Sequence, residues 1–545
     1  MLGEYDRLLI HHARRGASAK VEQLLNDGAH VDARMTGTKA TPLYVASLEG
    51  HDHVVRMLLE RGASVNLGRV GGDTPLLTAS WRGHEGVVQL LLEHGAAVNL
   101  VANAGWTSLS MASLKGHAVV VRLLLEHGAA INQVTDDGWS SLSCASLQGH
   151  EGAVQVLLEH GAAVNHVEQD GATPLLIASL EGHWSVVSLL LQHEAATNVS
   201  DNAGRTALFE TSKQGNECIA RLLLKHGAAV NLAKDTGETP LYVASLEGHE
   251  NVVRLLLERG AAVGDHVAHN GKTPLIVAIQ YDHEAIAQLL LQHGAAVNQA
   301  TNLGWTALLM ASQEGHVGMA QLLLEHGAAV NQALATGATA LFVASRHGQG
   351  TIVRLLLEYG AAVDQATNVG WTPMWNACQT GDLKIVQVLS SYGASRVFTN
   401  INSTAVEIAN VFGRDDVAAW LTASRCWSTP LHHLTLISVA RTRTLLRDGA
   451  NIFAASEASG PTPLTIAQNM FAAGNATDGS AAHLVLCAGR QWSPATHALF
   501  PAAARERACL LMRPLVLLAW ERLHPGMAAI DFLHYIIWFD ATRTQ

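Results

Sequence analysis

Aromatic and charged side chains are scarce in this 545-residue chain, at 5% and 15% of its residues. The charge is also one-sided, because 46 acidic residues outweigh 35 basic residues and leave a formal net charge of -11. A protein that binds the nucleic-acid backbone needs a basic stripe, which this balance does not favour. We therefore expect no nucleic-acid partner.

Long apolar runs and paired cysteines are missing as well. No stretch of about 18 apolar residues occurs, and the longest candidate, ACLLMRPLVLLAW, is interrupted by Arg513 and Pro514, so we expect no integral membrane segment. The first residues lack the uncharged apolar core of a signal peptide. Six scattered cysteines without a C-x-x-C pair are typical of free thiols in a reducing compartment. The expected location is intracellular, in the cytoplasm or the nucleus.

What the sequence has in abundance is repetition. A turn threonine or serine, followed two residues later by Leu or Met, recurs at intervals of 33 residues, with one interval of 34. The positions are Thr41, Thr74, Thr107, Ser140, Thr173, Thr206, Thr239, Thr273, Thr306, Thr339 and Thr372. Because the chain is too long for one ordinary core, this periodicity indicates an array whose core grows along one axis.

The repeating unit reads approximately TPLYVASLEGHxxVVRLLLEHGAAVN and resembles the ankyrin repeat, which has the signature T-P-L-H-x-A and a similar period. The resemblance covers about residues 5–424. It implies an all-α repeat solenoid of stacked helix-turn-helix units with β-turn fingers. It also implies that the concave face binds proteins.

Each unit carries the signals for two short helices. Thr-Pro begins the first helix, because the threonine oxygen accepts an early helical N–H and proline fits the first position. A glycine such as Gly50 ends it, and the VVRLLLE segment forms the second helix. The signature histidine is replaced in all eleven regular units and kept only at His432. We expect the repeats with serine there, Ser110 and Ser143, to be weak points.

We divide the chain into four parts. Residues 1–40 form an N-terminal capping repeat, and residues 41–424 form the regular ankyrin array with a closing repeat. Residues 425–490, which contain STPLHHL and PTPLTIAQ, form a second, degenerate ankyrin block. Residues 491–545 form a helical C-terminal tail with apolar residues at helical spacing.

The tail has three interpretations. It caps the last repeats, or it is a docking box in the manner of ubiquitin-ligase substrate adaptors with a SOCS box or an F-box, although neither diagnostic motif is present. In the third interpretation its helices mediate oligomerisation or attachment to a membrane surface, with the repeats as a spacer. Its arginines do not form a continuous polybasic face, which disfavours membrane attachment.

The 29 histidines invite a metal interpretation, but many of them follow two ladders. The Gly-His ladder comprises His51, His84, His117, His150, His183, His249 and His316, and the Glu-His-Gly ladder comprises His94, His127, His160 and His326. Stacked helices lie about 8 to 10 Å apart, whereas zinc needs several nitrogens at about 2.0 to 2.1 Å. We therefore expect capping and packing histidines, with no metal and no cofactor. Catalytic signatures such as HExxH and GxSxG are absent, so we expect no enzymatic activity.

Candidate partner-binding residues follow from the resemblance. In ankyrin stacks, the finger residue before the turn threonine and the residues before the mid-unit glycine project to the concave side. Here these positions hold two apolar zones and a charged centre: Trp81, Trp106 and Trp139; Trp305 and Trp371; and Arg205, Glu238 and Lys272. Aromatic anchors with arginine nearby are typical of interface hot spots. The alternative is that each tryptophan lies across the neighbouring finger and stabilises the stack.

The predicted function is a non-catalytic scaffold or adaptor that binds a protein partner on the concave face, with a ubiquitin-ligase role through the tail as an extension. The resemblance also implies that asparagines ending AAVN can be hydroxylated by an asparaginyl hydroxylase. These are Asn66, Asn99, Asn132, Asn165, Asn231, Asn298 and Asn331. Hydrogen bonding within the hairpin turn explains the same asparagines without any modification.

Overall fold

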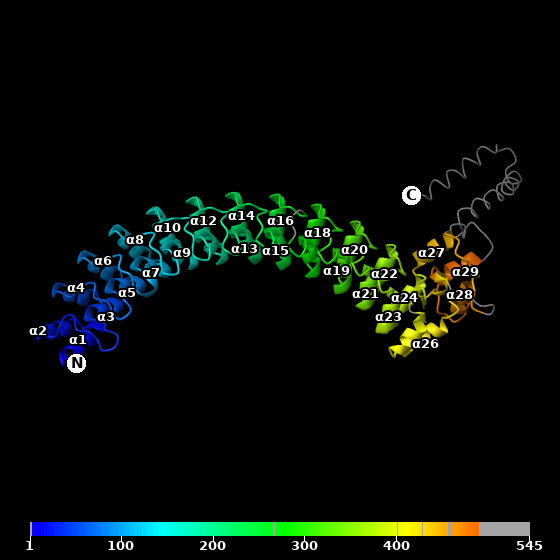
Figure 1. Cartoon of the computed structure of the whole chain (residues 1–545), viewed down its shortest axis with the longest axis horizontal. Coiled ribbons are helices and arrows are strands. Elements are labelled where there is room, and N and C mark those ends of the chain that lie inside the picture. The colour runs from blue at the N-terminus through cyan, green and yellow to red at the C-terminus, as the bar shows by residue number, and fades with distance from the viewer. Residues whose placement is uncertain (1–2, 265–267, 401, 428, 456–459, 490–545) are drawn as a thin grey trace, which may run out of the picture. The chain divides into compact units, whose positions relative to one another are not determined.

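A computed structural model of the chain describes residues 3–264, 268–400, 402–427, 429–455 and 460–489 (Figure 1). It separates into two compact units, Met1–Ala307 (unit 1) and Leu308–Gln545 (unit 2), and each is described by itself. The described residues form α-helices joined by turns, with a single two-stranded sheet among them. This confirms the predicted all-α repeat solenoid. The predicted tail, 491–545, lies outside the described residues, and the four-part division stays a prediction.

Unit 1 consists of helix pairs in two rows (Figure 1). Each odd-numbered helix contacts the odd-numbered helix of the next pair, and the even-numbered helices do the same. The elements are α1 (Glu4–Arg14), α2 (Ser18–Asn26), α3 (Pro42–Glu49), α4 (Asp52–Glu60), α5 (Pro75–Arg82), α6 (Glu85–Glu93), η1 (Asn103–Gly105), α7 (Ser108–Lys115), α8 (Ala118–Glu126), α9 (Ser141–Leu147), α10 (Glu151–Glu159), α11 (Pro174–Leu180), α12 (Trp184–Gln192), α13 (Ala207–Gln214), α14 (Glu217–Lys225), α15 (Pro240–Glu247), α16 (Glu250–Glu258), α17 (Pro274–Gln280) and α18 (Glu284–Gln292).

Unit 2 continues the pattern and ends in a different arrangement. Helices α21, α23 and α25 form one row, and α20, α22, α24 and α26 form the other. The elements are α19 (Ala307–Glu314), α20 (Val317–Glu325), α21 (Ala340–Arg346), α22 (Gly350–Glu358), α23 (Pro373–Thr380), α24 (Leu383–Ser391), β1 (Val397–Phe398), β2 (Ser403–Thr404), α25 (Ala405–Val411), α26 (Asp415–Ala423), η2 (Pro430–His432), α27 (Val439–Arg447), α28 (Pro463–Ala472) and α29 (Ala481–Gly489). The two strands pair antiparallel, with Val397 opposite Thr404.

The first helix of each pair begins and ends as the sequence predicts. Thr41 Oγ1 accepts a hydrogen bond from Tyr44 N at 3.1 Å, and Pro42 occupies the first helical position of α3. Gly50 ends this helix with φ of 78°, a left-handed conformation that favours glycine. The threonine or serine N-cap recurs through both units, and a glycine of positive φ follows most of the first helices; after α17, Asp282 takes this conformation instead.

In the repeats that have serine in place of the signature histidine, the serine supplies part of the hydrogen bonding that the histidine would give. Thr107 N donates to Ser110 Oγ at 3.0 Å, and Ser110 N donates to Thr107 Oγ1 at 3.1 Å. This reciprocal pair closes the turn whose weakening we expected from the sequence. His432 makes the local bond and also reaches the following segment, because its Nε2 lies 3.1 Å from Pro461 O. The serine-bearing repeats therefore keep the contact within the unit.

The Gly-His ladder joins consecutive repeats. His84 Nε2 lies 3.1 Å from Leu48 O, and His117 Nε2 lies 3.2 Å from Trp81 O. The histidine ring occupies the space beside the preceding repeat's helix-ending glycine: a Cβ added to Gly83 would lie 2.5 Å from the ring of His117. We call this pairing the Gly-His lock. It confirms the predicted packing role of these histidines.

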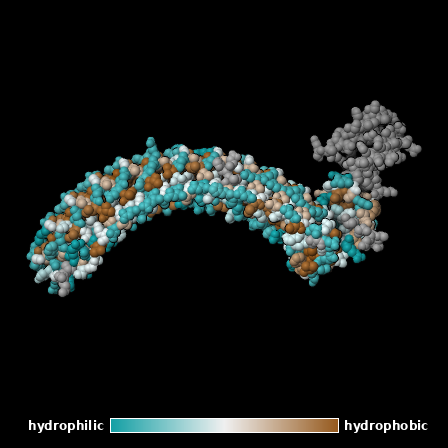
Figure 2. Space-filling view, in the orientation of Figure 1, coloured by the Kyte–Doolittle hydropathy of each residue, from teal (hydrophilic) through white to brown (hydrophobic). Residues whose placement is uncertain are grey.

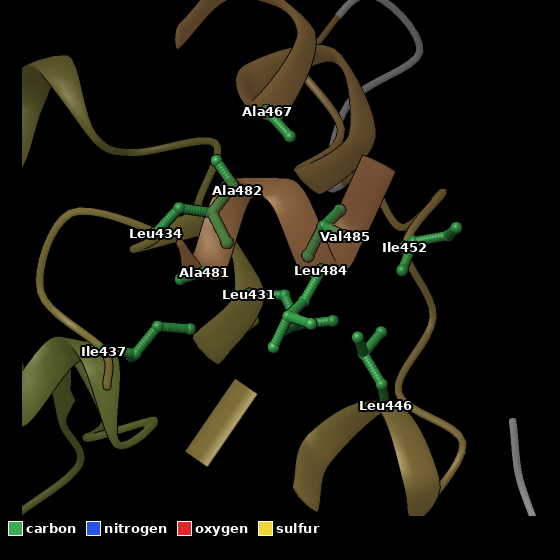
Figure 3. Packing of buried hydrophobic residues seen from close by; sticks show 10 residues of the cluster. All are labelled: Leu431, Leu434, Ile437, Leu446, Ile452, Ala467, Ala481, Ala482, Leu484 and Val485. Atoms are coloured by element: carbon green, nitrogen blue, oxygen red, sulfur yellow. The ribbon is translucent and has the colours of Figure 1, made fainter. Parts of the chain in front are cut away.

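The last described helices of unit 2 surround a separate core (Figure 3). Its ten buried residues are Leu431, Leu434, Ile437, Leu446, Ile452, Ala467, Ala481, Ala482, Leu484 and Val485. They come from η2, α27, α28, α29 and the connecting segments. We call residues 429–455 and 460–489 the terminal block. Because its buried side chains are few, its hydrophobic stabilisation is small beside that of the array.

Candidate functional site

The fingers hold the predicted binding residues in one recurring backbone geometry. Each finger is closed by a main-chain hydrogen bond to the carbonyl oxygen of the residue before the turn threonine or serine. The donor N and acceptor O are Ala102 and Trp106 (2.9 Å), Thr135 and Trp139 (3.0 Å), Asp201 and Arg205 (3.1 Å), Lys234 and Glu238 (2.9 Å), Ala268 and Lys272 (3.2 Å), Thr301 and Trp305 (2.9 Å), and Thr367 and Trp371 (2.9 Å). The bond uses the backbone alone, so the finger does not require tryptophan.

The four predicted tryptophans of unit 1 are half-buried. Trp106, Trp139 and Trp305 follow this pattern in the fingers, and Trp81 does so in the last turn of α5, where the Arg82 guanidinium lies 4.5 Å from its ring centre. No ring contact joins these tryptophans within the described part of unit 1. Figure 2 shows hydrophobic side chains gathered in separate patches over this unit, between bands of hydrophilic side chains. Each ring therefore keeps surface that its own repeat does not cover.

Trp371, in unit 2, packs against its own repeat. Its ring stacks on Trp375 with centroids 4.6 Å apart and planes within 1°, and Trp375 meets the edge of Phe412 at 6.3 Å. At this position the tryptophan packs within the stack, which is the alternative to partner binding given above. Trp371 remains 39% exposed, so the face away from Trp375 is open.

In the predicted charged centre, Arg205 and Glu238 form ion pairs within their own repeats. Arg205 donates from Nε to Asp201 Oδ2 at 2.7 Å and lies 3.3 Å from Glu210 Oε1 through Nη1. The hydrogen bond to Asp201 is the main cause of the raised pKa of Arg205. Glu238 pairs with Lys234 at 3.4 Å. The three predicted residues are thus not bonded to one another.

A hollow of about 410 Å³ lies beside this centre. Its lining includes Arg205, Glu238, Lys213 and the ring of Tyr242. Burial raises the pKa of Tyr242 to about 12, so its hydroxyl is protonated at neutral pH. Lys272 is directed elsewhere, because its Nζ donates to Gln280 Oε1 at 2.7 Å. The hollow combines a hydroxyl with charges of both signs.

The comparison with known families decides what this arrangement is. A family model described as ankyrin repeats (3 copies) matches the chain in seven overlapping segments: 9–102, 96–168, 161–234, 212–301, 259–334, 294–368 and 329–403. The chain belongs to the ankyrin-repeat family. Ankyrin repeats generally mediate protein-protein interaction and generally serve as non-enzymatic binding scaffolds. A search of curated proteins finds no match to the chain.

Other kinds of site are not found in the part of the chain that the structure describes. There, no helix is long and apolar enough to cross a membrane. The described residues also contain no group of three or more His, Cys, Asp or Glu side chains placed to hold a metal ion. The histidines of the Glu-His-Gly ladder instead bond within their own helices, as His94 Nδ1 does with Leu90 O at 2.8 Å.

Sequence reasoning missed a buried acid in the ankyrin fingers. Glu168 is 5% exposed, and neither carboxylate oxygen has a well-formed hydrogen bond among the described residues. Burial raises its pKa above the usual value. His166 Nε2 lies 4.0 Å from Glu168 Oε1.

The Cys144 thiol lies near this acid. Burial and, to a smaller extent, Glu168 raise the pKa of Cys144 to about 12, so this thiol is unreactive at neutral pH.

Glu210 is a second acid that sequence reasoning missed. It is 3% exposed on α13, where the equivalent residues of other repeats include Val45, Ile177 and Val243. A charged residue at a position that is uncharged in the other regular repeats, and apolar in most of them, was a visible signal. Arg205 compensates for part of the cost of burying it.

The ankyrin asparagines form a ladder between repeats. For six of the seven predicted asparagines, the side-chain Oδ1 accepts the backbone N–H of an alanine 31 residues further along the chain, at 2.7 to 2.8 Å. The pairs are Asn66 and Ala97, Asn99 and Ala130, Asn132 and Ala163, Asn165 and Ala196, Asn231 and Ala262, and Asn331 and Ala362. These bonds explain the asparagines structurally, and hydroxylation stays a hypothesis.

Proposed function

We propose that the ankyrin array of unit 1 binds a protein partner through the surface around Trp81, Trp106 and Trp139. The observation that carries this proposal is the finger geometry: the main-chain bond closes the finger, and the half-buried indole rings have no ring partner in the described part of the unit. Large aromatic side chains contribute strongly to interfaces because they remove much apolar surface from water at low entropic cost.

The charged centre sets which partners fit next to this aromatic surface. Arg205 and Glu238 are already paired within their repeats, so a partner gains little by pairing with either. They instead fix a pattern of charge that disfavours partners with a mismatched pattern. In unit 2, Trp371 offers only the face that Trp375 does not cover.

A role as a ubiquitin-ligase substrate adaptor is a finer proposal, which rests on the tail at 491–545. In this proposal the array holds the substrate and the tail recruits the ligase, in the cytoplasm or the nucleus. The alternative function assigns oligomerisation or membrane-surface attachment to the tail and leaves the repeats as a spacer. Removal of the tail distinguishes the two: capture of the array's partner persists in the first and changes with assembly state in the second.

Affinity purification with matched variants tests the proposed surface. The double variant Trp106→Ala/Trp139→Ala removes the two finger rings, and Trp184→Ala removes a 53%-exposed tryptophan at the start of α12, in the other helix row. We expect the double variant to lose a specific set of captured proteins and Trp184→Ala to retain them, with circular dichroism unchanged for both. If both variants capture the same proteins as the unmodified chain, the finger tryptophans are not the binding surface.

A further inference from the structure

In the described part of unit 2, other residues stand at the locking position: Gln349 and Arg414 fill the space beside Gly315 and Gly381, whereas the space beside Gly348 is left open as a groove. After Gly348, the position of the locking histidine holds Asp382, whose carboxylate oxygen would lie 3.8 Å from a Cβ on Gly348. In intact locks, such as Gly50 with His84, the ring would lie at 2.6 Å. The shorter aspartate leaves this space unfilled.

Two adjoining hollows, of about 650 Å³ and about 530 Å³, lie at this junction. Both are lined by Gly348, Asp382 and Lys384, and Arg346 lines the first while Arg354 lines the second. Both are open to the surface, so they suit an extended segment better than an enclosed small molecule. We call them together the Asp382 groove.

The Asp382 groove is positively charged in a chain of net charge -11. Arg346, Arg354 and Lys384 are exposed, and none of them forms a salt bridge in the part of unit 2 that the structure describes. The acid of the groove is occupied, because Asp382 Oδ1 accepts the Ile385 N–H at 3.0 Å and caps α24. Three cations therefore face solvent beside one capping carboxylate.

The first turns of α22 and α24 supply no acid to these cations. Several even-row helices of unit 1 begin with an acid, as α6 does with Glu85, α10 with Glu151 and α16 with Glu250. At the Asp382 groove, α22 begins with Gly350 and α24 with Leu383. Both the locking ring and the usual first-turn acid are thus replaced at the same junction.

We propose that the Asp382 groove binds an acidic segment of a protein partner, in which clustered Glu or Asp carboxylates pair with Arg346, Arg354 and Lys384. This inference rests on the proposed protein-binding function and gives it a second contact with stated chemistry. Complementary charge provides orientation and fast association, and the aromatic surface of unit 1 provides apolar burial. The partner is therefore a protein that carries an acidic stretch.

Fluorescence anisotropy with the full chain tests the groove directly. The probe is a fluorescein-labelled peptide of alternating Glu and Ser, and the same peptide with Gln in place of Glu is its control. We expect Arg346→Gln/Lys384→Gln to weaken binding of the acidic peptide roughly tenfold, because two exposed ion pairs are lost. Lys115→Gln, which alters an exposed lysine at the end of α7, should leave binding within about twofold.

Two substitutions at Asp382 distinguish the effect of the open space in the groove from the effect of the aspartate charge on peptide binding. Asp382→Asn removes the acid and keeps the space, so binding of the acidic peptide should tighten. Asp382→His removes the acid and refills the space with the ring found in intact locks, so binding should weaken. Equal binding by these two variants, or an unaltered affinity in Arg346→Gln/Lys384→Gln, overturns the proposal. Neither result affects the tryptophan surface, whose test is partner capture by the finger variants.

Discussion

At the scale of single residues, the fingers give some side chains the same surroundings in each repeat and give others, such as Glu168, surroundings of their own. Trp106 and Trp139 occupy equivalent positions because the fingers repeat. The burial of Glu168 depends on what the preceding repeat presents, here Ser143 and Cys144. Such contacts between repeats are not encoded in the period, so a composition-based interpretation treats this acid as solvated.

Glu168 provides a prediction at this scale. Its raised pKa means that the folded chain favours the protonated form, so the ionised form costs stability above pH 4.5, the ordinary value, and this cost declines as the pH falls. Glu168→Gln should therefore raise the free energy of unfolding at pH 7, by about 1 kcal/mol. Urea unfolding measures the change, and Glu181→Gln, at an exposed position after α11, is the control. A loss of stability in Glu168→Gln would show that the carboxylate is favourably paired.

At the scale of helices and turns, local chemistry predicts most of what the structure contains. A threonine or serine, often followed by proline, fixes where the first helix of a repeat begins, and in most repeats a glycine fixes where it ends. The sequence also shows Gly-His as a dipeptide, but it does not show that each histidine packs on the glycine of the preceding repeat. That pairing depends on how repeats stack, which a single unit does not specify.

The contribution of the Gly-His lock to stability can be measured by substituting two glycines of similar backbone geometry. Gly83 and Gly95 have φ of 78° and 80°, but a Cβ on Gly83 meets the His117 ring, whereas a Cβ on Gly95 meets nothing within 4 Å. Alanine at either position costs about 1 to 2 kcal/mol for the left-handed backbone. Gly83→Ala should cost about 1 to 3 kcal/mol more because the ring must move. Denaturant unfolding of the two variants gives the difference, and equal costs would mean that the ring adapts freely.

At the scale of the whole molecule, the terminal block differs from the repeats in how its polar groups are buried. His433 is 1% exposed among Trp420 and Trp427, and burial lowers its pKa to about 3, with smaller contributions from Arg396 and His432. Arg396 Nη2 is buried without a hydrogen-bond partner in the described residues, and its guanidinium lies 5.3 Å from the ring centre of Trp420. This junction is therefore sensitive to added positive charge.

Acidification should accordingly destabilise the terminal block first. The folded pKa of His433 lies below the ordinary value of 6.5, so its contribution to stability is complete above pH 6.5 and declines as the pH falls toward 3. At pH 5 the loss is on the order of 2 kcal/mol. Amide hydrogen exchange at pH 7 and pH 5, corrected for intrinsic rates and referenced to α15, measures it. His433→Phe should remove the pH dependence of exchange in the terminal block. If the pH dependence persists in that variant, groups other than His433 cause it.

The Gly-His lock also bears on how such a chain lengthens or shortens during evolution. Each lock joins residues one position further apart than the period, as Gly50 and His84 are, so its two halves always belong to different units. Copying a whole number of units that carry both the glycine and the histidine, as most units of the first half of the chain do, places these two residues in register at each new junction, wherever the copied segment begins. A deletion that removes part of a unit leaves one half without the other. Gene duplication can therefore extend the chain in whole units without new compensating substitutions, whereas fractional changes are selected against at the junction itself.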